Sequence, residues 1–269
     1  MPIDALFSAL WKSYVAVAPE VESIRKLFAP QNTNIVNDHI ALRTLQHPLL
    51  GIDQLAAPFI ALGYKIEGHY SFKKKKLRAV HLAHSNLDAK PKVFISELEL
   101  KRCSKQLQAL IDTQLLGLLS ENLKDIEILS ASGAHWGMPS YNVYKSLAEE
   151  SEYAAWFYVF GFIPNHFTVK VNDLMGFDTI ESVNKFLEHN GYLLNSVGGV
   201  VKGKPSDLLQ QSSTMASSVN VQFQEGNYAV PSCFYEFALR YNSKNGEQFS
   251  GFLEGNADKI FESTNRLNL

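Results

Sequence analysis

The sequence predicts an α+β fold, in which two βαβββ modules form a curled, barrel-like mixed sheet around a metal site, with extra helices packed outside. Three observations predict it. A strand that carries a histidine occurs twice, at 37–44 and at 165–171. An amphipathic helix follows each copy and ends at a Gly-Tyr pair that begins at Gly63 or Gly191. Each copy closes with a proline-led strand that contains a glutamate, so the chain reads as an internal repeat.

The first module is expected at about 36–100. Two helices precede it, because apolar residues recur at helical spacing over 3–15 and 21–28. In the strand at 37–44, alternation places His39, Ala41 and Arg43 on one face. A helix near 52–62 and strand-like segments at 64–72, 77–83 and 92–100 complete this module.

The second module is expected at about 164–241. A helical region at about 104–121 and another near 141–160 separate it from the first module. It contains the strand at 165–171, a helix at 179–190 and a last strand at 232–240. We expect residues 1–269 to form a single catalytic domain.

Composition excludes several classes of protein. Of 269 residues, 46% are hydrophobic and 19% charged, with a net charge of −2, so a nucleic-acid partner is not expected. The dense charge run Lys73–Lys76 is typical of a solvated turn. No apolar run approaches the ~20 residues of a membrane span. Cys103 and Cys233, with no secretory leader, indicate a cytoplasmic protein without a disulfide framework.

Three residues far apart in the sequence are candidates for one metal site. Two modules packed side by side would present His39 and His166 to the same cavity, and Glu236 of the last strand would complete the set. Two histidines and one carboxylate on one face of a metal are typical of non-haem iron(II) enzymes. The absence of nearby thiolates favours iron or manganese over structural zinc.

Each candidate has a plainer interpretation. A single strand histidine is more often a core or surface residue, but these two occupy equivalent repeat positions. A buried, unpaired Glu236 would be costly, so a metal or an arginine partner is expected. Glu97 or Glu99 of the first module is a ligand, a supporting residue or a surface residue. His135 is a candidate for the site entrance. The polar run Gln210–Thr214 either orients ligands and substrate or forms a polar loop.

Arg43 lies four residues after His39 on the same strand face, an advance of about 13 Å. Its side chain reaches back, so the guanidinium would stand about 6 Å or more from the metal. That position suits a catalytic and substrate-binding role, in which two parallel hydrogen bonds hold a substrate carboxylate. A structural pair with an acidic side chain is the alternative.

The segments NDHIALRT, AAWFYVFGFIPNHFTVKV, LLQQSSTMA, FYEFALR and ADKIFEST together resemble the 2-oxoadipate dioxygenase/decarboxylase family. That family is related to the vicinal-oxygen-chelate superfamily, which is built from paired βαβββ modules. The resemblance runs from about Asp38 to Thr264. It implies Fe(II) held by His39, His166 and Glu236, and an essential arginine, which is Arg43 here.

The resemblance also implies the reaction and its partners. A small 2-oxo dicarboxylic acid, 2-oxoadipate, reacts with O₂ to give 2-hydroxyglutarate and CO₂, a late step of bacterial lysine breakdown. Some members carry large insertions that this chain lacks, which leaves the exact 2-oxo acid open. Two other classes remain: a zinc- or manganese-dependent lyase, isomerase or hydrolase, and a small-ligand binding protein. The sequence defines neither product stereochemistry nor oligomeric state.

Overall fold

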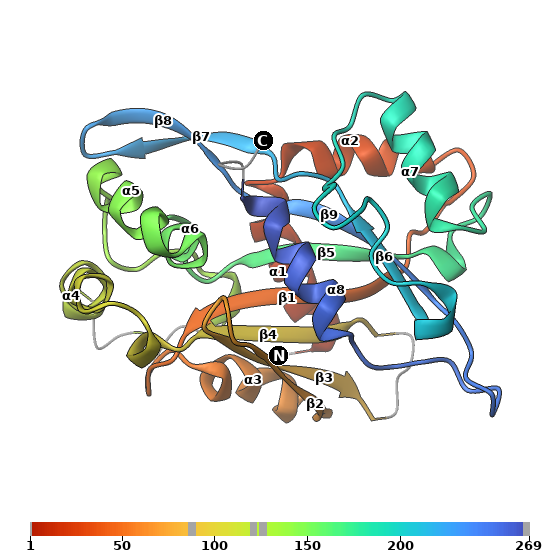
Figure 1. Ribbon diagram of the computed structural model, residues 1–269, viewed down its shortest axis with the longest axis horizontal. Helices are drawn as coiled ribbons and strands as arrows, with labels where there is room; N and C mark the ends of the chain where they lie inside the picture. The colour runs from red at the N-terminus through yellow and green to blue at the C-terminus, as the bar shows by residue number, and fades with distance from the viewer. Residues whose placement is uncertain (1, 86–89, 119–122, 124–127, 266–269) are drawn as a thin grey trace.

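Nine strands make two sheets in the computed structural model, which describes residues 2–85, 90–118, 123 and 128–265. They are β1 (Asn37–Leu45), β2 (Tyr64–Phe72), β3 (Leu77–His84), β4 (Lys92–Leu98), β5 (Pro164–Lys170), β6 (Leu209–Ser213), β7 (Ser218–Phe223), β8 (Gly226–Pro231) and β9 (Phe234–Arg240). Seven of them form one mixed sheet in the order β2-β3-β4-β1-β5-β9-β6 (Figure 1). The hairpin β7-β8 stands apart from it.

The first module forms as predicted, as one half of the large sheet. Helix α3 (Ile52–Ala61) follows β1, and β2, β3 and β4 then return as an antiparallel series. Strand β4 pairs in parallel with β1. Such a parallel pair needs a long crossover, which here includes the helix.

The second module repeats this arrangement with a difference. Helix α7 (Ile180–His189) follows β5, β9 pairs in parallel with β5, and β6 pairs antiparallel with β9. The described chain after Gly191, where the first module has β2, makes isolated bridges at Leu194 and Lys202 instead of a sheet strand. This half of the sheet is therefore narrower by one described strand, and the hairpin β7-β8 is inserted between β6 and β9.

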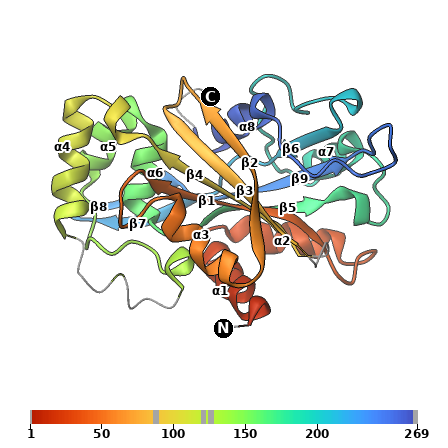
Figure 2. The ribbon, with the colours of Figure 1, turned by 90° about the horizontal axis from the view of Figure 1, so that it is seen from below.

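The two modules meet where β1 and β5 pair antiparallel, at the middle of the sheet. His39 lies opposite Thr168, and Ala41 lies opposite His166. The pairing is irregular near Asp38, where one residue of β1 is left over between Asn37 and His39. The curl of the sheet is visible from below in Figure 2. This central pair therefore brings both predicted histidines onto neighbouring strands.

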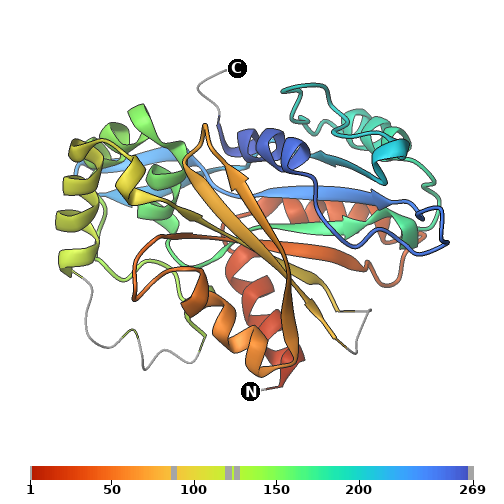
Figure 3. The ribbon, with the colours of Figure 1, turned by 60° about the horizontal axis from the view of Figure 1, so that its bottom comes forward.

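Helices cover both faces of the sheet. The outer face is covered by α1 (Ile3–Val15) and α3, below the sheet in Figure 3, and by α2 (Pro19–Phe28) and α7. Phe28 of α2, for example, packs its ring on Phe237 of β9 and Phe186 of α7. The inner face is covered by α6 (Glu152–Phe160) and α8 (Glu254–Ile260), whose side chains line the inner cavity or contact its lining. The strands at the centre are thus buried on both sides.

The central helices differ from the prediction in their limits. The expected helix at 104–121 is α4 (Lys105–Gln114) followed by a short 3-10 turn to Leu118, and residues 119–121 lie outside the described part. The stretch at 141–160 is two helices, α5 (Tyr141–Glu150) and α6. Ser151 separates them because its backbone is extended and its hydroxyl accepts the Ala154 N–H, which caps α6. Among the described residues, none of the helices is long and apolar enough to span a bilayer.

Candidate metal centre

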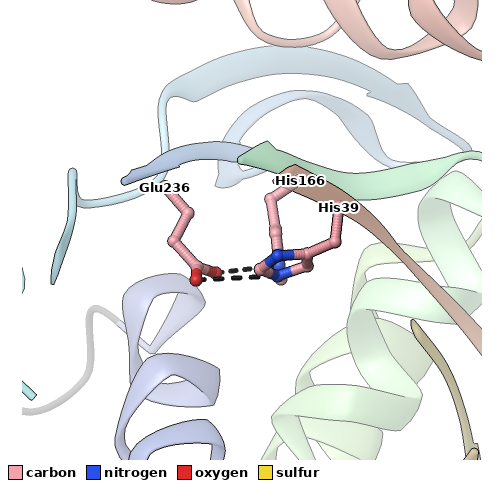
Figure 4. Close-up of side chains that lie close together, drawn as sticks. All are labelled: His39, His166 and Glu236. Carbon is pink, nitrogen blue, oxygen red and sulfur yellow. Dashed lines mark ion pairs between the residues drawn. The ribbon is translucent and has the colours of Figure 1, made fainter. Parts of the chain in front are cut away.

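His39, His166 and Glu236 come together on the inner face of the sheet, each from a different strand (Figure 4). One ligand atom from each residue lies within 4.8 Å of the other two. The exposed fractions are 2% for His39, 7% for His166 and 1% for Glu236. The group is one that could hold a metal ion, and water reaches it little.

The strand register explains the meeting. Thr168 of β5 lies opposite His39 on one side and opposite Glu236 on the other. These three residues form a row across β1, β5 and β9, and His166 lies two residues before Thr168. Because side chains of a strand alternate between faces, His166 and Thr168 point the same way. The histidines and the carboxylate therefore converge without any unusual loop.

Each histidine is oriented by the residue that precedes it. Asp38 Oδ1 lies 2.7 Å from His39 Nδ1, and Asn165 Oδ1 lies 3.3 Å from His166 Nδ1. These oxygens accept the Nδ1 protons, which leaves the Nε2 lone pairs for the centre of the group. Arg240 in turn holds Asp38, with its Nε and Nη2 donating to the carboxylate at 2.6 and 2.9 Å.

Glu236 uses its two oxygens differently. Its Oε1 accepts a hydrogen bond of 2.6 Å from Gln211 Nε2 and lies 3.6 Å from His39 Nε2. Its buried Oε2 lies 3.0 Å from His166 Nε2 but accepts no well-directed hydrogen bond from the described residues. A buried carboxylate oxygen left in this way is costly without a cation. Two imidazole nitrogens and this oxygen fit Fe(II), Mn(II) or Zn(II).

The charges of the group depend on one another. Burial raises the pKa of Glu236, but the imidazoles of His39 and His166 outweigh it and lower that pKa to about 2. Burial lowers the pKa of His166, so its ring is neutral at neutral pH. Burial also lowers the pKa of His39, but the carboxylates of Glu236 and Asp38 outweigh this effect and raise it. The site thus attracts one positive charge, which a proton or a metal ion can supply.

Arg43 lines the same cavity and already has an acidic partner. Its Nη1 lies 3.1 Å from Glu152 of α6, and its Nη2 donates to Thr264 Oγ1 at 2.9 Å. Its Nε is buried without a hydrogen-bond partner in the described chain. The guanidinium lies over the rings of Tyr153 and Trp156. The structural pair considered as an alternative therefore exists, and the Nε edge is left over for a ligand.

The cavity among these residues is small, about 30 Å³. Three phenylalanine rings, those of Phe94, Phe252 and Phe261, line it together with the candidate ligands. One water needs about 10–15 Å³ of such space, so an ion and one or two waters fit. A six-carbon acid enters only if side chains at the rim move.

Three other predicted site residues lie elsewhere. Glu97 Oε2 accepts the Ile52 N–H at 2.8 Å and pairs with Arg78, so it caps α3 from the outer face instead of binding metal. Glu99 pairs with Arg102 at the surface. His135 bonds to Ser132 at 2.7 Å and is not among the described residues that line the cavity.

In the polar run Gln210–Thr214, the first four residues lie in the buried edge strand β6 and Thr214 makes an isolated bridge to Leu194, so the run is not a loop. Gln211 points inward and bonds to Glu236, whereas Ser212 points outward and donates to Asn184 of α7. Within this run, Gln211 is therefore the residue that contacts a candidate ligand. Each polar residue has a partner within the protein, which explains why a polar strand can be buried.

Several residues around the site were not predicted. Asp38 and Asn165 could have been predicted, because the sequence places a polar residue immediately before each of the two histidines. Glu152 and Phe252 had none, because each reaches the site from a helix or loop with no periodic relation to the strands. Phe252 packs its ring edge-on against His39, with 4.7 Å between ring centroids.

A paired-module sheet with a buried His-His-Glu group defines a class of proteins by its fold and by a site that could hold a metal ion. A solved protein of the glyoxalase superfamily from Ralstonia eutropha shares this fold, with a TM-score of 0.76 at 21% identity over 92% of this chain and 84% of that one. The family model of the 2-oxoadipate dioxygenase/decarboxylases matches residues 6–248. The chain belongs to that family.

Curated relatives support the membership. The chain is 37% identical to the chloroplastic 2-oxoadipate dioxygenase/decarboxylase of Arabidopsis thaliana, over 93% of this chain and 74% of that one. It is 36% identical to the chloroplastic/amyloplastic enzyme of Oryza sativa, over 96% of this chain and 78% of that one. The prediction of a cytoplasmic protein is wrong by this comparison, since both relatives are named as plastid proteins. Two buried, unpaired cysteines do not distinguish the cytoplasm from a plastid.

Two solved structures are also similar over nearly the full chain. One is the hydroxyglutarate synthase of Oryza sativa in complex with 2-oxoadipate, with a TM-score of 0.90 and 33% identity, covering 100% of this chain and 96% of that one. The other, from Shewanella frigidimarina, is described as a candidate hydrolase, with a TM-score of 0.88 and 43% identity, covering 94% and 98%.

Proposed function

We propose that this protein is a 2-oxoadipate dioxygenase/decarboxylase, which converts 2-oxoadipate and O₂ to 2-hydroxyglutarate and CO₂. The observation that carries the proposal is the convergence of His39, His166 and Glu236 in a chain of this family. The solved rice relative binds 2-oxoadipate, which supports a 2-oxo dicarboxylic acid as the substrate class. The reaction would serve lysine breakdown.

His39, His166 and Glu236 would hold Fe(II) in this proposal. When bound, the iron supplies the activation of O₂ and the chelation of the 2-oxo acid. The protein contributes ligand geometry, which Asp38 and Gln211 maintain through the hydrogen bonds described above. The aromatic side chains of the cavity exclude water from the reacting acid.

Arg43 would bind the far carboxylate of the substrate. Its terminal nitrogens are held by Glu152 and Thr264, so the guanidinium is oriented before substrate arrives. Its Nε–H, together with the second proton of Nη2, offers the two parallel donors that a carboxylate needs. This arrangement favours dicarboxylic over monocarboxylic 2-oxo acids.

A hydrolase, lyase or isomerase that uses zinc or manganese is the second candidate, because the Shewanella relative is described as a candidate hydrolase. The test is anaerobic loading with Fe(II), Mn(II) or Zn(II), followed by 2-oxoadipate with and without O₂. We expect the iron form to produce 2-hydroxyglutarate from 2-oxoadipate only when O₂ is present. Turnover of 2-oxoadipate without O₂ would favour the second candidate.

A further inference from the structure

A chain of side-chain hydrogen bonds connects Glu236 with the C-terminal helix. Asn256 of α8 is 5% exposed, and its Nδ2 donates to Gln211 Oε1 at 3.0 Å. Gln211 Nε2 then donates to Glu236 Oε1 at 2.6 Å. The carbonyls of Lys202 and Leu209 lie farther from Asn256 Nδ2, at 3.4 Å each. The shortest contact of this amide group is therefore the one to Gln211.

The polarity of this chain matters because an amide has two different ends. The Gln211 side chain must turn its NH₂ toward Glu236, since its carbonyl oxygen would repel the carboxylate. The Asn256 NH₂ binds that carbonyl oxygen and thereby selects the correct end. In a buried site such bonds are strong and a wrong partner is costly.

The segment that carries Asn256 also reaches His39. Arg240 Nη1 donates to the carbonyls of Phe249 and Gly251, at 3.1 and 2.8 Å. The same guanidinium holds Asp38, which orients His39. Two of the three candidate ligands are thus supported by chains of contacts that end between Phe249 and Asn256.

We propose that Asn256 is a positioning residue for the Glu236 carboxylate, acting through Gln211, and that helix α8 is thereby a part of the metal centre. The inference rests on the proposed function only in its requirement that His39, His166 and Glu236 bind a divalent cation. Metal affinity and the docking of α8 are then coupled, and the coupling is reciprocal.

Asn195 provides a matched control. It is fully buried, and its Nδ2 donates to Lys259 O and Ser263 Oγ, both at 2.9 Å. It therefore holds the same C-terminal segment by an amide group, but its described hydrogen bonds do not include Gln211 or Glu236. Loss of Asn195 loosens the segment without interrupting the chain to the carboxylate.

The experiment is an anaerobic titration with Co(II), whose visible absorption reports ligand geometry without turnover. We compare the wild type with Asn256→Ala, Asn256→Asp and Asn195→Ala. Asn256→Asp keeps the shape but removes the donor to Gln211. We expect both Asn256 variants to bind Co(II) about 10-fold more weakly and with an altered spectrum. Asn195→Ala loosens the segment but leaves the chain to Glu236 intact, so it is expected to keep the wild-type spectrum and to lose much less affinity than either Asn256 variant.

Equal Co(II) affinity and spectra in the wild type and both Asn256 variants would overturn the inference. So would an equal loss in Asn195→Ala, since the effect would then arise from docking alone. A wild type that binds no Co(II) would instead contradict the proposed metal site itself. If a variant folds poorly, the coupling is tested instead by amide hydrogen exchange of the wild type with and without Co(II). We expect Co(II) to protect amides of 249–264 but not those of the β7-β8 hairpin, and no added protection would refute the coupling.

Discussion

Phe94 of β4 occupies in the first module the position that Glu236 of β9 occupies in the second. Two residues after His39, Ala41 lies opposite Phe94. Two residues after His166, Thr168 lies opposite Glu236. The duplicated modules thus supply two histidines but one carboxylate. Because a second carboxylate is absent, a metal bound here would keep coordination positions free, which an oxygenase needs for substrate and O₂.

Phe94→Glu is expected to add the second carboxylate at this equivalent position. The variant should bind Fe(II) at least as tightly as the wild type, because the new carboxylate meets a cation, but turnover should fall at least 100-fold as an open position closes. Phe94→Leu is the control for the lost ring. Metal titration and O₂ uptake measure both effects. Full activity of Phe94→Glu would show that the two modules are not equivalent here.

The three candidate ligands should each be required for metal. We expect His39→Ala, His166→Ala and Glu236→Gln to lose bound Fe(II), since each removes one donor of three in a site with no described replacement nearby. Metal content after gel filtration measures this loss. Ser132→Ala, which alters the hydrogen bond of His135 outside the cavity, serves as the control. A full complement of iron in any of the three ligand variants would place the metal elsewhere.

How far the sequence predicts this site depends on how local each signal is. His39 and His166 were predictable because each follows a repeated pattern on one strand face. The role of Glu97 stayed open between ligand, supporting residue and surface residue, because the register between β1 and β4 is not written in either strand alone. Glu97 lies three residues after Phe94, so alternation turns it to the outer face.

The supporting residues depend on long-range packing. Asp38 and Arg240 are 202 residues apart in the chain, and Gln211 and Asn256 are 45 apart. Neither pair has a period or spacing that sequence reasoning can use. The predicted fold class is confirmed by the likeness to the glyoxalase-superfamily protein, whereas the shortened second module depends on how Gly191–Lys202 packs.

Arg43 should matter for substrate and not for metal. Arg43→Ala is expected to retain Fe(II), because its hydrogen bonds go to Glu152 and Thr264. Loss of a charge-assisted carboxylate contact should lower kcat/KM for 2-oxoadipate by about 10- to 100-fold. A substrate of equal length without the far carboxylate, 2-oxohexanoate, should be used equally by both proteins. An equal loss with both substrates would mean that Arg43 has a structural role.

His81 should make stability depend on pH. Burial, with help from Lys92 and Arg240, lowers the pKa of His81 to about 4. Its Nδ1 accepts the Tyr70 hydroxyl, and its Nε2 has no described partner. Between about pH 6.5 and pH 4 the unfolded chain binds the extra proton and the folded chain does not. The free energy of unfolding therefore falls as the pH falls through this window.

Urea unfolding of the wild type and His81→Phe at pH 7 and pH 5 measures this contribution. Both proteins lose stability from their carboxylates, and the wild type should lose about 2 kcal/mol more than the variant. Tyr70→Phe, which removes the partner of His81 but keeps the imidazole, should retain most of the pH dependence. Parallel pH profiles for the wild type and His81→Phe would show that His81 is not responsible.

We propose above that His39, His166 and Glu236 hold a metal that couples O₂ to the breakdown of a 2-oxo acid. The most direct measurement is simultaneous O₂ uptake and CO₂ release by iron-loaded protein given 2-oxoadipate, with Glu236→Gln beside it. We expect one O₂ consumed and one CO₂ released for each 2-hydroxyglutarate formed by the wild type, and no turnover by the variant. Product without O₂ uptake, or equal rates in both proteins, would contradict it.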